Sequence, residues 1–148
     1  MSVSIQEEDF DVASVLDEFK QGHGDSGAVV SFTGLVRTSG EAATIEAMTL
    51  EHYPGMTEKS LAAIEQQARS RWQLNEVRII HRIGRLAAGE NIVLVATASA
   101  HRQAAFEAAQ FIMDHLKTEA PFWKKEHTSR GDRWVEGRQS DHDAKSRW

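Results

Sequence analysis

The sequence predicts an α+β domain with a mainly antiparallel sheet, two principal helices and a short N-terminal helix. Several short runs are rich in β-branched and aromatic residues and are bounded by glycine-containing turns, which is typical of strands. Two longer segments instead repeat apolar residues at steps of three and four, the spacing of amphipathic helices. The order in which these helices and strands follow one another favours the α+β class.

The N-terminal part is predicted to form a short helix followed by two strands. Residues 10–20 carry apolar residues at helical spacing. Residues 28–37, AVVSFTGLVR, are rich in β-branched and aromatic residues, so we expect a buried strand that ends on Arg37. Polar and apolar residues roughly alternate over residues 44–53, which indicates a second, pairing strand.

Three glycines between the first helix and the first strand match the G-x-G-x-x-G spelling of a nucleotide-binding loop: Gly22, Gly24 and Gly27. A dinucleotide-binding loop of this kind requires a strand before it and a helix after it. The predicted order is the reverse here. We therefore interpret the segment as a turn.

The middle of the chain is predicted to contain one helix and the two clearest strands. Thr57 is a plausible cap for a helix that extends to about Arg71. Residues 76–83 and 91–98 are strand candidates, joined by the segment GRLAAGE with a glycine near each end. These two strands should form a hairpin.

The last long helix is expected to follow Ser99, a plausible N-cap. It must end near Glu119, because Pro121 disfavours helical geometry at the residue before it. Two short strand candidates, residues 122–128 and 132–136, then flank the turn SRGD.

Length and charge limit the class of protein. With 148 residues, 41% of them hydrophobic, the chain can form one domain with a substantial core. We expect residues 1–136 to form a single catalytic domain and residues 137–148 to form a polar, mobile tail. A net charge of −5 argues against binding to nucleic acid, because such surfaces are normally basic. No apolar run reaches membrane-spanning length and the start is acidic, so we expect a cytoplasmic protein without a membrane partner.

Cysteine is absent from the sequence. This excludes disulfides, thiolate metal sites and any cysteine nucleophile or persulfide on this chain. The seven histidines show neither H-x-x-x-H nor H-E-x-x-H spacing, and no G-x-S-x-G motif occurs. We therefore expect no metal and no bound cofactor, and any chemistry must be carried out by Lys, Arg and His.

The start of the last long helix carries two cations, His101 and Arg102. The partial positive charge of a helix N-terminus disfavours cations there by about 0.3 to 1 kcal/mol. A bound anion would reverse this penalty, because N-terminal N–H groups and arginine both favour phosphate or carboxylate. Both residues could instead be surface groups paired with Glu107 or Asp114.

Each remaining candidate also has a purely structural interpretation. Arg37 could be the solvated end of its strand, and Lys117 is stabilised by the dipole of the last helical turn. Lys124 and Lys125 could protect a strand edge against aggregation. At most one of these two should point into a pocket, since successive strand residues face opposite sides. Trp123 is more often a core residue than a cofactor-stacking residue.

Five segments of the chain carry a specific combined pattern. They are FTGLVR (32–37), LEHYPGMTEK (50–59), HRIGRLAAGE (81–90), SAHRQAAFEA (99–108) and LKTEAPFWKKE (116–126). In this order and spacing they resemble the large, catalytic subunit of the molybdopterin synthase family. The resemblance extends from Gly27 to Arg138 and implies a fold of the α/β-hammerhead type.

This resemblance implies a sulfurtransferase of molybdenum cofactor biosynthesis, which converts cyclic pyranopterin monophosphate (precursor Z) into the dithiolene-bearing molybdopterin. It also implies a small ubiquitin-like partner subunit that brings sulfur as a C-terminal Gly-Gly thiocarboxylate. The implied assembly is a heterotetramer with a dimer of large subunits at its centre. The lack of cysteine fits this scheme, because such a chain cannot hold the sulfur itself.

The resemblance associates Lys117 and Lys124 with catalysis. The segments that it associates with substrate binding contain Leu35, Val36, Arg37, His101, Arg102, Lys117, Lys124, Lys125 and Glu126. Arg138 is expected to add a further cation to this substrate-binding cluster. We expect Arg37, His101 and Arg102 to hold the phosphate or the pterin, while the two catalytic lysines assist thiocarboxylate attack and stabilise the tetrahedral intermediate.

The length of the last helix constrains how these residues can meet. His101 and Lys117 are sixteen residues apart, or about 24 Å on an unbroken helix, which no small pterin spans. Either the helix kinks sharply, or the pocket combines Lys117 and Lys124 of one chain with His101 and Arg102 of a second copy. We favour the second arrangement.

Two other functions use the same residues. A non-catalytic module could bind a phosphorylated metabolite or the C-terminal tail of a partner through the cationic cluster. An RNA-binding α+β domain could use Phe122 and Trp123 as a stacking platform, although the acidic composition disfavours it.

Overall fold

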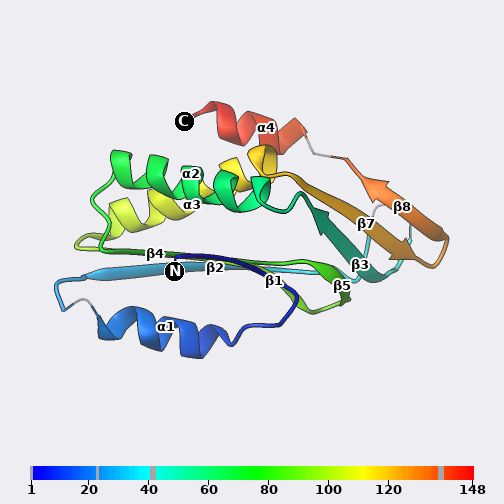
Figure 1. The fold of residues 1–148 in the computed structure, drawn as a ribbon, viewed down its shortest axis with the longest axis horizontal. Coiled ribbons are helices and arrows are strands. Elements are labelled where there is room, and N and C mark those ends of the chain that lie inside the picture. The colour runs from blue at the N-terminus through cyan, green and yellow to red at the C-terminus, as the bar shows by residue number, and fades with distance from the viewer. Residues whose placement is uncertain (1, 23, 41–42, 137–138) are drawn as a thin grey trace.

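The computed structural model describes residues 2–22, 24–40, 43–136 and 139–148. Figure 1 shows a sheet that lies between one helix on one face and two helices on the other, with a second sheet towards one end of the molecule. The α+β class and the mainly antiparallel strand pairing are confirmed.

The first sheet has the strand order β1–β4–β6–β2. Its strands are Val3–Gln6 (β1), Glu76–Arg82 (β4), Asn91–Ser99 (β6) and Ala28–Leu35 (β2). β1 and β4 are parallel, whereas the other two neighbouring pairs are antiparallel. Every residue from 92 to 99 in β6 is buried, because this strand is covered by helices on both faces, and its sequence is accordingly almost continuously apolar.

The second sheet has the strand order β5–β3–β7–β8 and is antiparallel throughout. Its strands are Gly84–Ala87 (β5), Ile45–His52 (β3), Phe122–Thr128 (β7) and Gly131–Val135 (β8). β7 lies inside this sheet, between β3 and β8. The interpretation of Lys124 and Lys125 as protection for a strand edge is therefore wrong.

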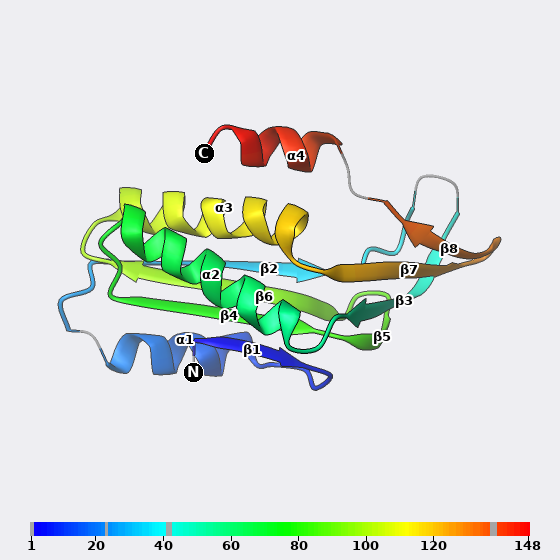
Figure 2. The same cartoon turned by 45° about the horizontal axis from the view of Figure 1, so that its top comes forward.

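Three of the four helices in the described part of the chain cover the two faces of the first sheet, and the fourth in chain order lies on the third (Figures 1 and 2). In chain order, the four are Val12–Gln21 (α1), Met56–Arg71 (α2), Arg102–Glu119 (α3) and Gln139–Ser146 (α4). α2 and α3 pack on one face over the main core, which includes Leu61, Ile64, Val77, Ile79, Phe111 and Ile112. α1 packs on the opposite face over a smaller cluster, which includes Phe10, Phe19, Ile80 and Leu94. None of the helices in the described part of the chain is both long and apolar enough to cross a membrane.

Both predicted helix caps are wrong. Ser99 is buried at the end of β6, where its hydroxyl donates to the carbonyl oxygen of Gln73 (2.8 Å), and His101 is the N-cap of α3. Thr57 lies within α2 rather than before it, and Gly55 takes the N-cap position. In both cases the hydroxyl that marked a possible cap bonds to a backbone carbonyl elsewhere.

The predicted hairpin is confirmed in part. β4 and β6 pair with each other, but the segment GRLAAGE that joins them contains β5. β5 leaves the first sheet and pairs with β3 in the second. The chain thus crosses from one sheet to the other within a segment that the glycines marked as a loop, and the N-terminal strand β1 was not predicted at all.

The expectation of a mobile end at residues 137–148 is wrong where the structure describes it, because α4 packs against α3. The indole ring of Trp148 meets the rings of Trp72 and Phe111 edge-on, with centroids 5.6 Å away in each case. Its Nε1–H donates to Oδ2 of the buried Asp114 (2.6 Å). The division of the chain into a catalytic domain and a tail stays a prediction.

Candidate active site

Segments that are distant in the sequence meet at a cavity of about 350 Å³. Five of the predicted substrate-binding residues line it: Leu35, Arg37, Lys117, Lys124 and Glu126. They come from the end of β2, the last turn of α3 and the middle of β7. Three cations of an acidic chain are therefore gathered around one space.

Backbone hydrogen bonds hold the end of β2 in place at this cavity. The N–H of Val36 donates to the carbonyl oxygen of Glu90 (2.9 Å), and the carbonyl oxygen of Val36 accepts from Gly89 (2.8 Å). Gly89 adopts a φ of 89°, which side chains disfavour, so a glycine suits this turn. Because the backbone of Val36 is fixed, Leu35 and Arg37 on either side of it are directed to the cavity.

The alternation of β7 decides which of its residues face the cavity. Phe122, Lys124 and Glu126 line it. Lys125 points to the opposite face of the sheet, where its Nζ lies 3.9 Å from Oδ2 of Asp132 and 5.5 Å from the ring centroid of Trp134. Only one of the two neighbouring lysines therefore reaches this cavity, as the strand geometry requires.

A buried histidine lies behind the two cavity lysines. The ring of His81 stacks on Phe122 with centroids 3.8 Å apart, and its Nδ1 lies 2.8 Å from the carbonyl oxygen of Arg82. Because a carbonyl only accepts, Nδ1 must carry the proton. Burial, together with the charges of Lys124 and Lys117, lowers the pKa of His81 to about 3. This imidazole is consequently neutral at pH 7 and adds no further cation to Arg37, Lys117 and Lys124.

Carboxylates also face the cavity. Glu126 is buried and its Oε1 lies 3.5 Å from Nε of Arg133, while Glu136 and Asp141 line the side towards the C-terminus. Apolar walls come from Met48, Ile92, Phe122 and Val135. The cavity thus presents cations, carboxylates and an apolar surface together.

Among the residues that the structure describes, no group of three or more His, Asp or Glu side chains is placed to hold a metal ion. The polar side chains at the cavity are those of Arg, Lys, Glu and Asp. Their chemistry is limited to binding charged groups, stabilising developing charge and transferring protons.

The family model described as MoaE protein matches residues 5–119. The chain belongs to the MoaE family. A relative named molybdopterin synthase catalytic subunit from Escherichia coli K12 is 60% identical over 124 residues, covering 84% of this chain and 83% of its own length. A relative of the same name from Vibrio cholerae is 54% identical over 146 residues, covering 99% of this chain and 97% of its own length.

Solved structures resemble this MoaE chain over nearly its whole length. The MoaE protein of Burkholderia ambifaria has a TM-score of 0.85 at 46% identity, covering 99% of this chain and 97% of that one. A molybdopterin synthase structure from Staphylococcus aureus has a TM-score of 0.84 at 33% identity, covering 92% and 98%. A chain in a Helicobacter pylori complex of subunits 1 and 2 of molybdopterin-converting factor shares the fold, with a TM-score of 0.78 at 18% identity, covering 93% and 92%.

Two predicted site residues of the MoaE chain lie away from the cavity. His101 and Arg102 are exposed at the N-terminal end of α3, whereas Lys117 is in its last turn. α3 is continuous over Arg102–Glu119, so this separation is about 24 Å along its axis. Neither His101 nor Arg102 forms an ion pair with a described residue. Their suggested partners, Glu107 and Asp114, accept hydrogen bonds from other side chains instead. The sharp kink that would have brought both ends together is absent from this helix.

The other predicted residues divide into three cases. Val36 is only 2% exposed and belongs to the main core, so it supports the cavity without lining it. Lys125 faces the other side of β7. Arg138 lies outside the described residues.

Sequence reasoning missed Glu136 and Asp141, the carboxylates that line the C-terminal side of this MoaE cavity. Asp141 lies in α4, within the stretch expected to be a mobile tail, so no pattern connected it with β7. His81 was missed as well. The alternation of β4, with apolar residues around it, was the one signal that could have placed His81 in the interior.

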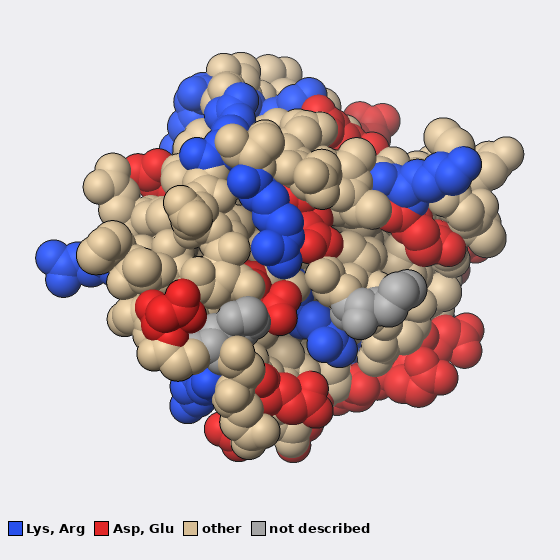
Figure 3. All heavy atoms as spheres, turned by 60° about the vertical axis from the view of Figure 1, so that its left-hand side comes forward, with Lys and Arg blue, Asp and Glu red and all other residues tan. Residues whose placement is uncertain are grey.

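The predicted aromatic platform for RNA is not formed. Phe122 stacks on His81 inside the molecule, whereas Trp123 lies on the opposite face of β7 and is 49% exposed. Trp123 is therefore not a core residue either. On the face seen in Figure 3, Lys and Arg lie among Asp and Glu, and no continuous basic surface covers it.

Proposed function

We propose that this chain is the catalytic subunit of a molybdopterin synthase, a sulfurtransferase of molybdenum cofactor biosynthesis. Its relatives in E. coli and V. cholerae carry that name. The observation that carries the proposal is the cavity where Arg37, Lys117 and Lys124 converge on a chain of net charge −5. A local group of cations on an acidic protein attracts anionic ligands.

The proposed substrate is cyclic pyranopterin monophosphate, and the sulfur donor is a C-terminal thiocarboxylate. Both are anionic. The thiocarboxylate sulfur attacks an oxygen-bearing side-chain carbon of the pterin. A C–S bond forms while the C–O bond of that carbon breaks, and the oxygen leaves as water after protonation or stays on the phosphate. The two molecules are then joined as a thioester. Water then cleaves the acyl C–S bond, so that the sulfur stays on the pterin and the donor ends in a plain carboxylate. Two such transfers produce the dithiolene of molybdopterin.

The predicted site residues at or beside the cavity have different proposed parts in this reaction. Arg37 binds the phosphate or the pterin, since its guanidinium can donate two hydrogen bonds to one oxyanion. Lys117 and Lys124 assist the attack and stabilise the negative charge of the tetrahedral intermediate. Leu35 and Glu126 shape the cavity. Val36 acts through its fixed backbone, and we propose no direct substrate contact for Lys125.

The proposed sulfur donor is a small ubiquitin-like partner subunit that ends in Gly-Gly. Because this chain has no cysteine, it cannot carry a persulfide, and a second protein has to bring the sulfur. We further propose that two copies of this chain form the centre of a heterotetramer, with one small subunit at each end. We also propose a cytoplasmic location for this assembly.

His101 and Arg102 enter the proposed site from a second copy of the chain. Their position at the far end of a straight α3 is incompatible with a pocket built from one chain. A symmetric dimer would place the N-terminal end of one α3 beside the Lys117 end of the other. Each pocket would then hold cations from both copies, and Arg138 would add a further one.

Replacing Lys117 by Ala tests the catalytic role. We expect molybdopterin formation to fall by at least about a hundredfold, because removing one preorganised donor to a tetrahedral intermediate has effects of that size. Lys117 is exposed, so the variant should fold normally, which circular dichroism and thermal unfolding can verify. Turnover close to that of the unmodified chain would refute the assignment.

Mixing two inactive variants tests the shared pocket. Arg102→Ala and Lys117→Ala chains, co-expressed and co-purified, would give mixed dimers with one intact pocket each. Random assortment should restore about a quarter of the normal activity. If each pocket were built from a single chain, the mixture would stay as inactive as its components.

A further inference from the structure

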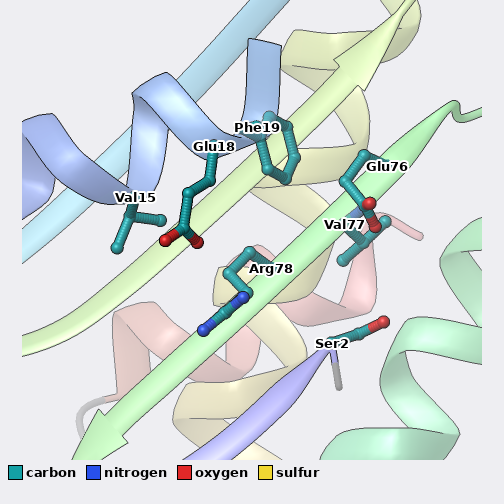
Figure 4. A pocket seen from close by; sticks show the side chains of 7 residues that line it. All are labelled: Ser2, Val15, Glu18, Phe19, Glu76, Val77 and Arg78. Carbon is teal, nitrogen blue, oxygen red and sulfur yellow. The ribbon is translucent and has the colours of Figure 1, made fainter. Parts of the chain in front are cut away.

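A second cavity, of about 290 Å³, lies beneath α1 on the face of the first sheet opposite α2 and α3 (Figure 4). Its walls come from α1, β4 and the start of the chain. It shares no lining residue with the candidate active site. Neither the fold nor the proposed reaction gives this cavity a role.

An arginine in this cavity has a buried donor without a partner. Arg78 lies on β4 between Val77 and Ile79, which belong to the main core, so its side chain points to the α1 face. Its Nε is buried and forms no hydrogen bond with any described residue. Such a donor is unfavourable unless water or a ligand satisfies it.

A neighbouring arginine on the same strand shows what a satisfied guanidinium looks like in this protein. Arg82 points to the same face, and its Nε and Nη2 donate to the carbonyl oxygen of Glu7 (3.1 and 2.9 Å). Its Nη1 donates to the carbonyl oxygen of Asn91 (3.0 Å). Arg82 and Arg78 therefore lie on the same face of the same strand, but only Arg82 has a hydrogen-bond acceptor for its Nε–H.

Negative charge faces Arg78 across the cavity. In Figure 4 the carboxylate of Glu18, on α1, points towards the space that the guanidinium of Arg78 enters. Within the described part of the chain, these two side chains do not form an ion pair with each other. Glu76 is a second carboxylate on the wall, but it already accepts from the N–H of Val77 (3.0 Å) and its Oε1 lies 3.6 Å from Nη2 of Arg69. The opposite charges of Glu18 and Arg78 therefore remain separated by open space.

We propose that this cavity binds a small zwitterion of the α-amino acid class, whose carboxylate accepts from the Nε edge of Arg78 and whose ammonium group donates to Glu18. The Nε–H and a neighbouring Nη–H of arginine form a fork that matches a carboxylate. Val15 and Phe19 on α1 offer an apolar surface for a short aliphatic side chain.

The charges of the wall argue against simpler ligands. A ligand with only a negative charge, such as inorganic phosphate, would approach Glu18 as well as Arg78. A ligand with only a positive charge would be repelled by Arg78 and would leave its Nε without an acceptor. Only a molecule with both charges satisfies both sides of the cavity.

The test uses the full-length chain and three matched probes. L-Valine carries both charges, 3-methylbutanoate lacks the ammonium group, and isobutylamine lacks the carboxylate. In ¹H–¹⁵N NMR spectra of the arginine Nε–H region, L-valine should shift the Arg78 signal in a saturable way. Each single-charge probe should bind at least about tenfold more weakly than L-valine, since each lacks one charged hydrogen bond. The Arg82 signal is the internal control and should not move.

Two variants complete the test. The Arg78→Lys variant identifies the signal, because it removes the Nε–H. The Glu18→Gln variant changes an exposed helix residue and should fold normally, and it should reduce L-valine binding about tenfold, to the level of 3-methylbutanoate. The proposal is overturned if L-valine gives no saturable shift, which would mean that only water fills the cavity. It is equally overturned if all three probes act alike or if Glu18→Gln leaves binding unchanged. No outcome depends on molybdopterin synthesis.

Discussion

Acidification from about pH 7.5 to about pH 5 should lower the free energy of unfolding by about 2 kcal/mol through His81 alone. In the folded chain, burial lowers the pKa of this ring to about 3, with the charges of Lys124 and Lys117 acting in the same direction. In the unfolded chain the ring titrates near pH 6.5. Between these two values only the unfolded chain binds the proton, so the stabilisation is complete above about pH 6.5 and is lost as the pH falls. At about pH 5, some 1.5 units below the unfolded pKa, the loss is about 2 kcal/mol at 1.36 kcal/mol per unit.

Urea unfolding at the two pH values, followed by tryptophan fluorescence, measures this effect. His81→Phe keeps an aromatic ring against Phe122 but cannot take up a proton, so its pH-dependent loss should be smaller by about 2 kcal/mol. His142→Asn changes an exposed histidine on α4 and should keep the full loss. If His81→Phe and the unmodified chain lose the same free energy, the reasoning about the buried ring is wrong. Should His81→Phe fail to fold, the ring can be followed by NMR in the unmodified chain, where any titration between pH 5 and 7.5 would contradict it equally.

Three further predictions test the packing and the cavity. Trp148→Ala should lower the free energy of unfolding by about 2 to 4 kcal/mol, since it removes two aromatic contacts and a hydrogen bond to a buried carboxylate. Thermal unfolding measures this effect, and a decrease in Tm of less than about 3 °C would contradict the docking of α4. Gly27→Ala should destabilise the chain strongly, because the added Cβ would overlap the carbonyl oxygen of Ala100, the residue that follows β6, whereas Gly24→Ala meets open space and should change stability little. Equal effects of the two substitutions in urea unfolding would be inconsistent with this close approach. Lys124→Ala should reduce molybdopterin formation by at least about a hundredfold, whereas Lys125→Ala should keep most of the activity. A larger loss of activity in Lys125→Ala than in Lys124→Ala would show that the other face of β7 carries the chemistry.

Local sequence patterns predicted most of the fold. The spacing of apolar residues located α1, α2 and α3 within one or two residues at most ends, because each of these helices buries one stripe. The strand periodicity of β7 also predicted that only one of Lys124 and Lys125 could reach a pocket, and it is Lys124 that lines the cavity. These features depend on neighbours in the sequence.

The missed features depend on contacts between distant segments. β5 has only four residues and is stabilised by pairing with β3, so glycines in its sequence suggested a loop. α4 is polar on its own, and its position follows from Trp148, which packs on α2 and α3 residues. Asp141 reaches the cavity only because α4 is docked in this way. A single sequence carries no local signal for such contacts.

Most of the charged residues of the site could be named from the sequence, but which of them share one cavity could not. The converging cations Arg37, Lys117 and Lys124 were named from the family resemblance, and all three line one cavity. The spacing along α3 excluded His101 from the same cavity, since a helix is rigid and its rise is fixed. Two of the carboxylates beside these cations, Glu136 and Asp141, could not be anticipated, because they come from the C-terminal segment.

The most direct test of the account is the stoichiometry of a complete reaction. The purified chain is incubated with cyclic pyranopterin monophosphate and a thiocarboxylated partner, and both molybdopterin and the partner's plain carboxylate are quantified by mass spectrometry. The account predicts about two partner molecules converted for each molybdopterin formed, since the dithiolene contains two sulfurs and each cleaved thioester leaves one carboxylate. If the chain binds both molecules and forms no molybdopterin, it is a binding module and the proposed catalysis by the cavity lysines is contradicted.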